Sequence, residues 1–380
     1  MATNHQIEQM WTAGRRNGFL TADIPESTHA VADLPHPAME LIGTKSPTLA
    51  SSSAKEIDEL VADLGGCPDS EFGALSAGMT EAVLRCYVSI AAHLIHRPGL
   101  AERRALPRAV ARPLWELSQI VDRPPSLTYA SYVLSNFTTP VAPRTAAADF
   151  AVGQTPSGTA DEEWFIAVHQ SVESVGGEVV AAVDAIDVGL TEQDGAALSN
   201  ALDSIESCLD FAVRTMPTIR ERLDPEVFRD EIRPLLYGHD VITFEGVHGA
   251  PQVSYIGETG AQSGVIRAAD ALLGTRHTPG MVTSMNRFLD CAPPWHQRYL
   301  IKVAGIGSKL AQAELPTRIR EARRRALCAL TEFRRVHLSV VTDYLAPEGT
   351  SLSERGTGGT HFQVWLQRLI DETDEAVKSA

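Results

Sequence analysis

The chain has 380 residues, 44% of them hydrophobic, which is typical of a folded globular protein with one large core or two smaller ones. Its net charge of −15 opposes binding to nucleic acid and to anionic membrane surfaces, so we expect neither as a partner. No apolar run approaches the ~20 residues that a membrane-crossing helix needs, and the first residues lack the pattern of a secretory signal. We therefore expect a cytoplasmic protein.

The cysteines also favour a cytoplasmic protein. They are odd in number, widely spaced and without a CxxC pair, which predicts reduced thiols rather than a disulfide framework. They are Cys67, Cys86, Cys208, Cys291 and Cys328.

Helical periodicity dominates the chain, and strand signals are nearly absent, so the predicted fold is all-α. Residues 1–50 are rich in proline and read as loop. The pattern predicts helices over 54–64, 72–96, 108–121, 128–137, 161–186, 193–216, 225–237, 264–274, 279–291, 294–304 and 317–345, with a last helix beyond Gly359.

A change of composition divides the chain. Residues 138–160 are rich in Pro, Thr, Ala and Gly, which indicates a linker. We predict a small helical domain over 1–140, a linker over 141–160 and a larger helical domain over 161–380, with the small domain packed over the larger one.

His337 lies in the middle of an apolar helical face, in the segment TEFRRVHLSVVTDYL. Burying an imidazole without a partner costs roughly 1–3 kcal/mol, so it needs either a hydrogen-bonding group or a metal. A core histidine bonded to a carbonyl or carboxylate is one interpretation. An axial ligand of haem iron is the other, and the glycine-rich run Gly356–Thr360 downstream suits a loop that closes on a ligand.

Four segments of the chain form a recognisable set. They are ALPRAVARPLWELSQIVDRPPSLTYASYVLSNF at 105–137, FRDEIRPLLYG at 228–238, FEGVHGAPQVSYIGETGAQSGVIRAADALLG at 244–274, and RRVHLSVVTDYL at 334–345 with the downstream GTGGT. Together they resemble the indoleamine 2,3-dioxygenase family of haem enzymes, with order and spacing that match across nearly the whole chain and only the first ~20 residues unanchored. The resemblance implies a two-domain helical fold with haem b in the larger domain, and oxidation of tryptophan to N-formylkynurenine by O₂.

The resemblance also implies a cofactor site. His337 matches the proximal haem ligand and is the only expected metal ligand. Arg334 matches an arginine that meets a haem propionate, and Asp270 matches the carboxylate that pairs with it. Gly260 and Ala261 match the loop on the distal face of the haem.

The implied substrate site lies on that distal side. Arg233 matches the arginine that meets the substrate carboxylate, and Phe165 and Phe228 match aromatic walls for the indole ring. The remaining matches are the deep-pocket positions Tyr129, Tyr132 and Val133, the distal-loop residues Thr259 and Gly260, and Thr357, which meets the substrate ammonium group. Without the resemblance, each phenylalanine would be an ordinary core residue and each arginine a surface charge.

Two positions depart from the mammalian members. His169 stands where they have serine, and an imidazole there can accept the indole N–H or bond to bound O₂. Arg229 replaces a second phenylalanine and is expected to point away from the haem. His93 and His96, three residues apart on a helix, could form a metal pair but match nothing functional, so we interpret them as structural.

The predicted function is a haem dioxygenase that acts on L-tryptophan or a close indole derivative, with His169, Phe165, Phe228 and Arg233 as the catalytic set. It needs an electron donor that keeps the iron ferrous. Two alternatives stay open: a haem monooxygenase or rearranging enzyme for an indole, and a haem-based gas sensor or carrier without turnover. A monomer or weak dimer is expected.

Overall fold

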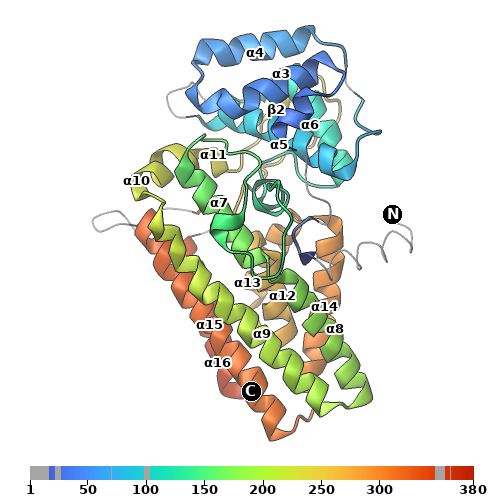
Figure 1. Cartoon of the computed structure of the whole chain (residues 1–380), viewed down its shortest axis with the longest axis vertical. Helices are drawn as coiled ribbons and strands as arrows, with labels where there is room; N and C mark the ends of the chain where they lie inside the picture. Colours follow the sequence, from blue (N-terminus) through green and yellow to red (C-terminus); the bar gives the residue numbers. More distant parts are fainter. Residues whose placement is uncertain (1–16, 22–26, 70, 98–102, 347–355, 360) are drawn as a thin grey trace.

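The computed structural model describes residues 17–21, 27–69, 71–97, 103–346, 356–359 and 361–380. Within them the chain is almost entirely helical, which confirms the predicted all-α class. The helices form an elongated molecule, with the N-terminal helices gathered at one end and a bundle of long helices filling the other (Figure 1).

The N-terminal end holds short helices around one long buried helix, α5. Its elements are α2 (Thr28–Ala32), α3 (Pro37–Lys45), the 3₁₀ turn η1 (Ser46–Ser51), α4 (Ala54–Gly66), α5 (Ala77–His96), α6 (Arg108–Val121), a π-turn η2 (Ala130–Leu134) and a 3₁₀ turn η3 (Ala147–Asp149).

The prediction of a loop over residues 1–50 is wrong for the described part of that range. Helix α2 begins after Ser27, whose hydroxyl accepts a hydrogen bond from the backbone N–H of Ala30. Helix α3 has Pro37 in its first turn, where a missing N–H has no cost. Pro37 and Pro47 therefore lie in the first turns of α3 and η1, while Pro25 lies outside the described residues.

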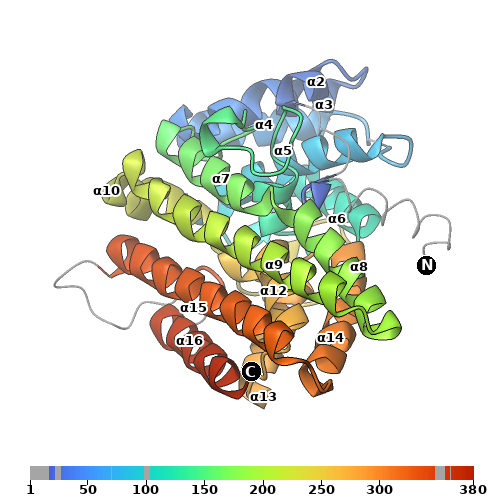
Figure 2. The same cartoon turned by 60° about the horizontal axis from the view of Figure 1, so that its bottom comes forward.

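The larger end is built on α15, which packs against α9 on one side and α16 on the other (Figure 2). Its elements are α7 (Ala160–Glu173), α8 (Gly176–Glu192), α9 (Gly195–Thr215), η4 (Met216–Glu221), α10 (Pro225–Val227), the π-turn η5 (Phe228–Ile232), α11 (Arg233–Leu236), η6 (Gly260–Gln262), α12 (Gly264–Leu273), α13 (Pro279–Leu289), α14 (Pro294–Gln312), α15 (Thr317–Leu345) and α16 (Phe362–Ser379).

The helix predicted over 161–186 is in fact two helices, because a tight contact interrupts it. Gly176 lies so close to the backbone of Gly18 that an added Cβ would come within 2.9 Å of the Gly18 Cα. The hydroxyl of Ser174 donates to the carbonyl of Ser171 at 2.6 Å, which closes the end of α7. Helix α7, which holds Phe165 and His169, therefore ends at Glu173.

Two strands occur in the described residues. β1 (Ala105–Leu106) and β2 (Thr243–Phe244) pair in parallel, which joins the N-terminal part of the chain to the segment before the distal loop. Such short strands leave no alternating pattern in the sequence.

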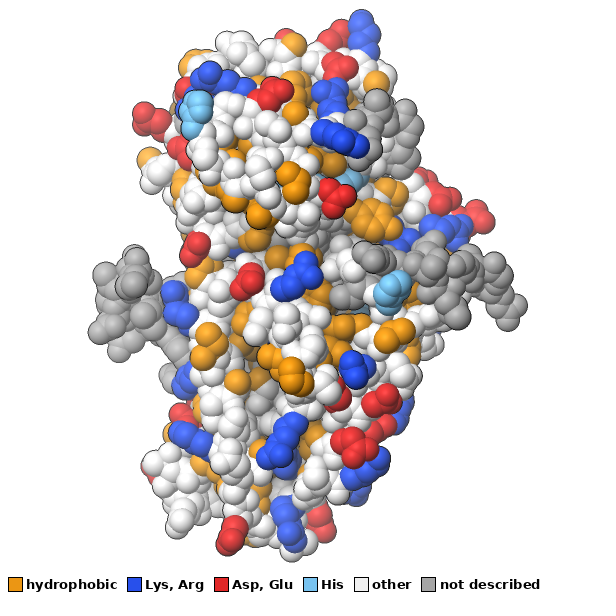
Figure 3. Space-filling model, turned by 180° about the vertical axis from the view of Figure 1, so that it is seen from behind, with side chains coloured by type: hydrophobic (Ala, Val, Ile, Leu, Met, Phe, Trp, Pro, Cys, Tyr) orange, Lys and Arg blue, Asp and Glu red, His pale blue; other side chains and the backbone are white. Residues whose placement is uncertain are grey.

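One hydrophobic cluster runs from the N-terminal helices through α7 to α15, and a second fills the bundle around α8, α9 and α14. The first cluster therefore crosses residues 141–160, and the two-domain division stays a prediction. On the face seen from behind, charged side chains of both signs are scattered without a continuous basic area (Figure 3). In the described segments no helix combines the length and apolar character that a bilayer crossing requires.

Candidate functional site

Two adjoining cavities lie between α7, α15, α16 and the loop before α12. They enclose about 900 and 700 Å³ of space, counted to their open mouths. Side chains of His169, Met216, Ala261, His337 and Leu366 border both cavities. We refer to the one that also contains Arg233 and Phe228 as the first cavity, and the one that contains Arg334 and Asp270 as the second.

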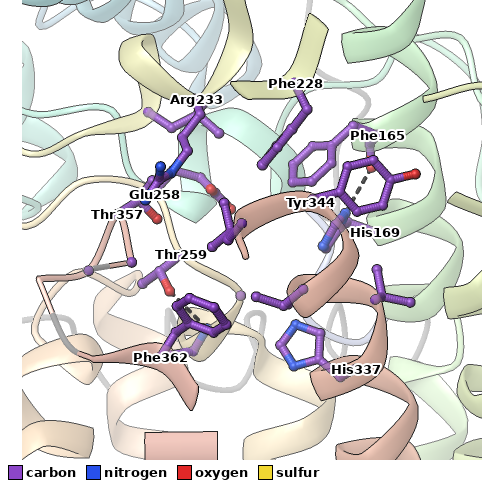
Figure 4. A pocket seen from close by; sticks show the side chains of 18 of the residues that line it. Phe165, His169, Phe228, Arg233, Glu258, Thr259, His337, Tyr344, Thr357 and Phe362 are labelled. Atoms are coloured by element: carbon purple, nitrogen blue, oxygen red, sulfur yellow. Dashed lines mark hydrogen bonds between the residues drawn. The ribbon is translucent and has the colours of Figure 1, made fainter. Parts of the chain in front are cut away.

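His337 lies on α15 at the wall that the two cavities share (Figure 4). Its ring stacks on Phe333 with centroids 6.0 Å apart, and neither ring nitrogen has a hydrogen-bond partner among the described residues. Burial lowers its pKa to about 4, with a further contribution from His169. The imidazole is therefore neutral at pH 7, which is the form that ligates a metal.

The second cavity contains a buried ion pair. Arg334 Nη2 lies 2.8 Å from Asp270 Oδ1, and both side chains are almost fully buried. Burial opposes ionisation of Asp270, but Arg334 and His277 outweigh it and hold the pKa of this carboxyl below its usual range. Arg267 borders the same cavity, and Arg334 Nε is buried without a hydrogen-bond partner among the described residues.

These residues fit a haem. An axial ligand needs an unprotonated imidazole that faces open space, and His337 is one. The propionates of a haem need cationic side chains at the pocket wall, and Arg334 and Arg267 are two such side chains. The Nε of Arg334 is buried and has no hydrogen-bond partner among the described residues, so it can donate to a ligand.

Two residues that extend this ion pair, His277 and Glu372, are not predicted by the sequence. His277 Nε2 lies 2.7 Å from Asp270 Oδ2, and its Nδ1 lies 2.6 Å from Glu372 Oε2. Arg334 also donates to the carbonyl of Leu369 and to the hydroxyl of Thr373. These contacts tie α12, α15 and α16 together. No local motif signals them, because His277 and Glu372 are 95 residues apart.

Aromatic rings line one side of the first cavity. The Phe165 ring lies 4.4 Å from His169 and 5.3 Å from Phe228, and Tyr344 meets the edge of Phe228 at 5.6 Å. The centroid distances of the Phe165–Phe228 and Phe228–Tyr344 pairs fall in the range of favourable aromatic pairs. A flat aromatic ligand thus has a wall of rings to pack against.

His169 has a defined tautomer. Its Nδ1 lies 2.8 Å from the carbonyl oxygen of Phe165, which can only accept, so Nδ1 donates and Nε2 is left as an acceptor. Burial lowers the pKa of His169, against the opposing effect of this hydrogen bond, so the ring stays neutral. The sequence-predicted distal histidine therefore borders both cavities with a free acceptor nitrogen.

Polar residues line the opposite side, where Arg233, Glu258, Thr259 and Thr357 lie across from Phe165 and His169 (Figure 4). Arg233 is 6% exposed and lies over the ring of Tyr237 at 5.4 Å. It begins α11, directly after the π-turn η5 and before Pro234. Gly260 and Ala261 border both cavities, while Thr360 lies outside the described residues.

The deep-pocket expectation is not met in full. Tyr129 borders the second cavity, while Tyr132 and Val133 border neither. The hydroxyl of Tyr132 donates to Glu162 at 2.7 Å, and that of Tyr129 to Glu173 at 3.2 Å. Two buried carboxylates that no pattern singled out therefore turn these tyrosines away from the first cavity.

The other singled-out residues lie outside the site. Arg229 borders neither cavity and forms an ion pair with Asp230 at 3.4 Å. His93 Nε2 donates to the carbonyl of Pro156 at 2.9 Å, and His96 lies near Tyr237, in keeping with structural roles. No cluster of metal-ligating side chains occurs in the described segments, and their cysteines are all free.

A helical frame that places a neutral histidine between a cation-lined cavity and an aromatic cavity defines a cofactor-binding protein with an adjoining ligand pocket. The chain belongs to the indoleamine 2,3-dioxygenase family, whose model matches residues 79–376. This is a family of haem-dependent dioxygenases.

Relatives in the family have more than one name. Indoleamine 2,3-dioxygenase 1 of Rattus norvegicus is 29% identical over 73% of this chain and 74% of its own length. Indoleamine 2,3-dioxygenase acdA of Aspergillus candidus is 26% identical over 97% and 96%. A protein named myoglobin, from Haliotis madaka, is 26% identical over 71% and 74%.

Proposed function

We propose that this protein is a haem b dioxygenase that opens the indole ring of L-tryptophan, or of a close derivative, to N-formylkynurenine. The observation that carries the proposal is the place of His337. It borders both a cavity with the Arg334–Asp270 pair and a cavity with an aromatic wall and Arg233. A bound haem would thus face a pocket suited to an indole amino acid.

His337 would hold the iron, and Arg334 and Arg267 would hold the propionates. Ferrous haem supplies the binding and activation of O₂, which no side chain can supply. An electron donor must keep the iron ferrous.

The remaining side chains bind and orient the substrate. Phe165 and Phe228 pack against the indole ring, and Arg233 holds the carboxylate through two parallel hydrogen bonds. Thr357 meets the amino group from the loop after α15. The main contribution of the protein is to hold the indole ring in one orientation, because the reaction depends on the close approach of the indole C2 and C3 atoms to O₂.

His169 accepts the indole N–H. Its Nε2 is unprotonated because Nδ1 donates to Phe165. The low pKa that burial imposes keeps this acceptor available across the physiological range. The hydrogen bond fixes which edge of the indole ring faces the haem.

A second candidate function is reversible O₂ binding without turnover, which the relatives named myoglobin favour. The first cavity favours the enzyme, since an O₂ carrier has no need of an arginine and two phenylalanines around a pocket next to the haem. A monooxygenase or rearranging enzyme would use the same pocket and differ in its product.

The product formed under ¹⁸O₂ distinguishes these functions. The haem-loaded, reduced protein is mixed with L-tryptophan, and the product is analysed by mass spectrometry. Two labelled oxygen atoms in N-formylkynurenine support the dioxygenase, and one labelled atom indicates a monooxygenase. An oxygenated spectrum that persists without product contradicts both enzymes and indicates an O₂ carrier.

A further inference from the structure

Glu258 is a buried acid in the first cavity that the roles above do not use. Its side chain is 3% exposed, and it lies on the same side of the pocket as Arg233 and Thr357 (Figure 4). Its Oε1 is buried without a hydrogen-bond partner, and no ion pair to the carboxyl occurs among the described residues. A buried polar atom without a partner needs an explanation, and a ligand group that enters the cavity supplies one.

Other buried carboxyls in the same region have partners. Glu162 accepts from Tyr132 and from the backbone of Ser157, and Glu173 accepts from Tyr129 and Ser263. Within the described segments Asp270 Oδ1 forms no hydrogen bond of good geometry, but it lies in an ion pair with Arg334, and Oδ2 meets His277. Glu258 differs from these three carboxyls because no charged or hydrogen-bonding partner among the described residues meets its Oε1.

The backbone fixes Glu258 at the cavity. Its N–H donates to the carbonyl of Leu236 at 3.1 Å. Gln262 holds the same loop by donating to the carbonyl of Gly257 at 2.9 Å and accepting from the N–H of Tyr129 at 2.8 Å. Gly257 lies against the backbone of Leu236 so closely that no side chain would fit there. These contacts hold the backbone of Glu258 at the edge of the cavity.

We propose that Glu258 determines substrate specificity by pairing with the amino group of the substrate, so that the first cavity selects an indole that bears a free amine. This proposal rests on the function proposed above. The head of an amino acid has a carboxylate that suits Arg233 and an ammonium group that suits Glu258. The ring N–H already has an acceptor in His169.

Thr357 cannot take this role alone. A hydroxyl can accept a hydrogen bond from an ammonium group, but it cannot neutralise the charge that the ammonium brings into a buried site. Glu258 can, at the loss of one proton. Burial and the nearby Glu162 raise its pKa to about 8, so the free protein holds the carboxyl largely protonated at pH 7. Binding of the ammonium group would ionise it and release that proton to the buffer.

The test compares two ligands that differ only in the amine, L-tryptophan and indole-3-propionate. Each is titrated into the haem-loaded protein without O₂, and the dissociation constant is read from the absorption spectrum. Calorimetry in two buffers of different ionisation enthalpy gives the protons released. Wild type should bind L-tryptophan more tightly and release close to one proton at pH 7.

Glu258→Gln keeps the shape of the side chain and removes its charge. We expect it to weaken binding of L-tryptophan at least tenfold, to change that of indole-3-propionate less than threefold and to abolish proton release. Glu258→Met, which also removes the acceptor, should act in the same direction. The matched control is Glu245→Gln, the same change at an exposed site after β2, which should alter neither ligand.

An equal loss of affinity for both ligands in Glu258→Gln, or unchanged tryptophan binding with unchanged proton release, would overturn the proposal. If wild type binds both ligands equally well and still turns over tryptophan, this inference fails while the proposed function stands. If wild type binds neither ligand, both fail.

Discussion

Arg233 illustrates how a charged residue becomes part of a binding site. Its exposed fraction is 6%, and the π-turn before it and Pro234 after it place it at the start of a four-residue helix that faces the first cavity. A buried guanidinium there is well suited to a carboxylate, because its fork forms two parallel hydrogen bonds.

Arg233→Ala should raise the KM for L-tryptophan about tenfold to a hundredfold, because a hydrogen bond to a charged group contributes about 1.5–3 kcal/mol. The haem content should stay the same, since Arg233 borders only the first cavity. Steady-state kinetics with Arg229→Ala as the control tests this, because Arg229 borders neither cavity. An unchanged KM would remove Arg233 from the substrate site.

His169→Phe should lower kcat/KM for L-tryptophan at least tenfold, because the ring keeps its place in the aromatic wall but loses the acceptor. The comparison substrate is 1-methyltryptophan, which has no indole N–H. Wild type should discriminate against it, and the variant should not. Discrimination that survives in the variant would show that His169 does not accept this proton.

At the level of the elements, α12, α15 and α16 are held together by one buried network of charges. His277 bridges Asp270 on α12 and Glu372 on α16 with both ring nitrogens, and Asp270 in turn pairs with Arg334 on α15. A ring that donates to two carboxylates carries both protons, so this histidine is an imidazolium. Burial opposes that charge, but Asp270 and Glu372 outweigh it and raise the pKa of His277 above its usual value.

The contribution of His277 to the free energy of unfolding depends on pH. The stabilisation from His277 is fully present below the usual histidine pKa of about 6.5, and it is lost as the pH rises through the raised pKa of the folded state. His277→Gln should lower the free energy of unfolding of the haem-free protein by about 3–5 kcal/mol at pH 6, the cost of breaking a buried pair. The difference from wild type should shrink towards pH 9.

Denaturant unfolding at several pH values measures this difference. His296→Gln provides a control, because His296 is buried with a pKa lowered to about 3 and is neutral throughout this range. If the difference in the free energy of unfolding between wild type and His277→Gln stays constant from pH 6 to 9, the imidazolium bridge is contradicted.

The helices with strong periodicity were predictable, while the interruptions were not. α6 and α15 have the predicted ends, because apolar spacing and flanking prolines define them locally. The break between α7 and α8 depends on a contact with Gly18, which is more than 150 residues away in sequence. The parallel pair of β1 and β2 depends likewise on distant segments.

The candidate site also has residues that the sequence predicts and residues that it does not. His337, Arg233 and the aromatic wall follow from motifs that resemble a known family, and the structure brings them to common cavities. Glu258 and His277 had no signal of their own, since a glutamate in a loop or a histidine before a helix is ordinarily exposed. The resemblance assigns Tyr129 and Tyr132 to the deep end of the substrate pocket. The sequence does not show that their hydroxyls donate to the buried carboxylates of Glu173 and Glu162.

On the scale of the whole molecule, the cavities lie in the larger helical end and are lined by residues between Tyr129 and Leu369. The hydrophobic cluster that holds the N-terminal helices includes Phe165 and Phe228 on the substrate side and Phe333 beneath His337. The core that folds the protein is therefore continuous with the walls of the site. A ligand that binds only the folded state should stabilise the whole chain.

The central claim is that His337 holds a haem whose iron lets this pocket oxidise tryptophan. The most direct test is the absorption spectrum of the purified, reduced protein under O₂ with L-tryptophan, followed until product accumulates. The account predicts a Soret band, lost in His337→Ala, together with the absorbance of N-formylkynurenine. A protein that binds no haem when supplied with it, or that binds haem equally well without His337, would contradict the account.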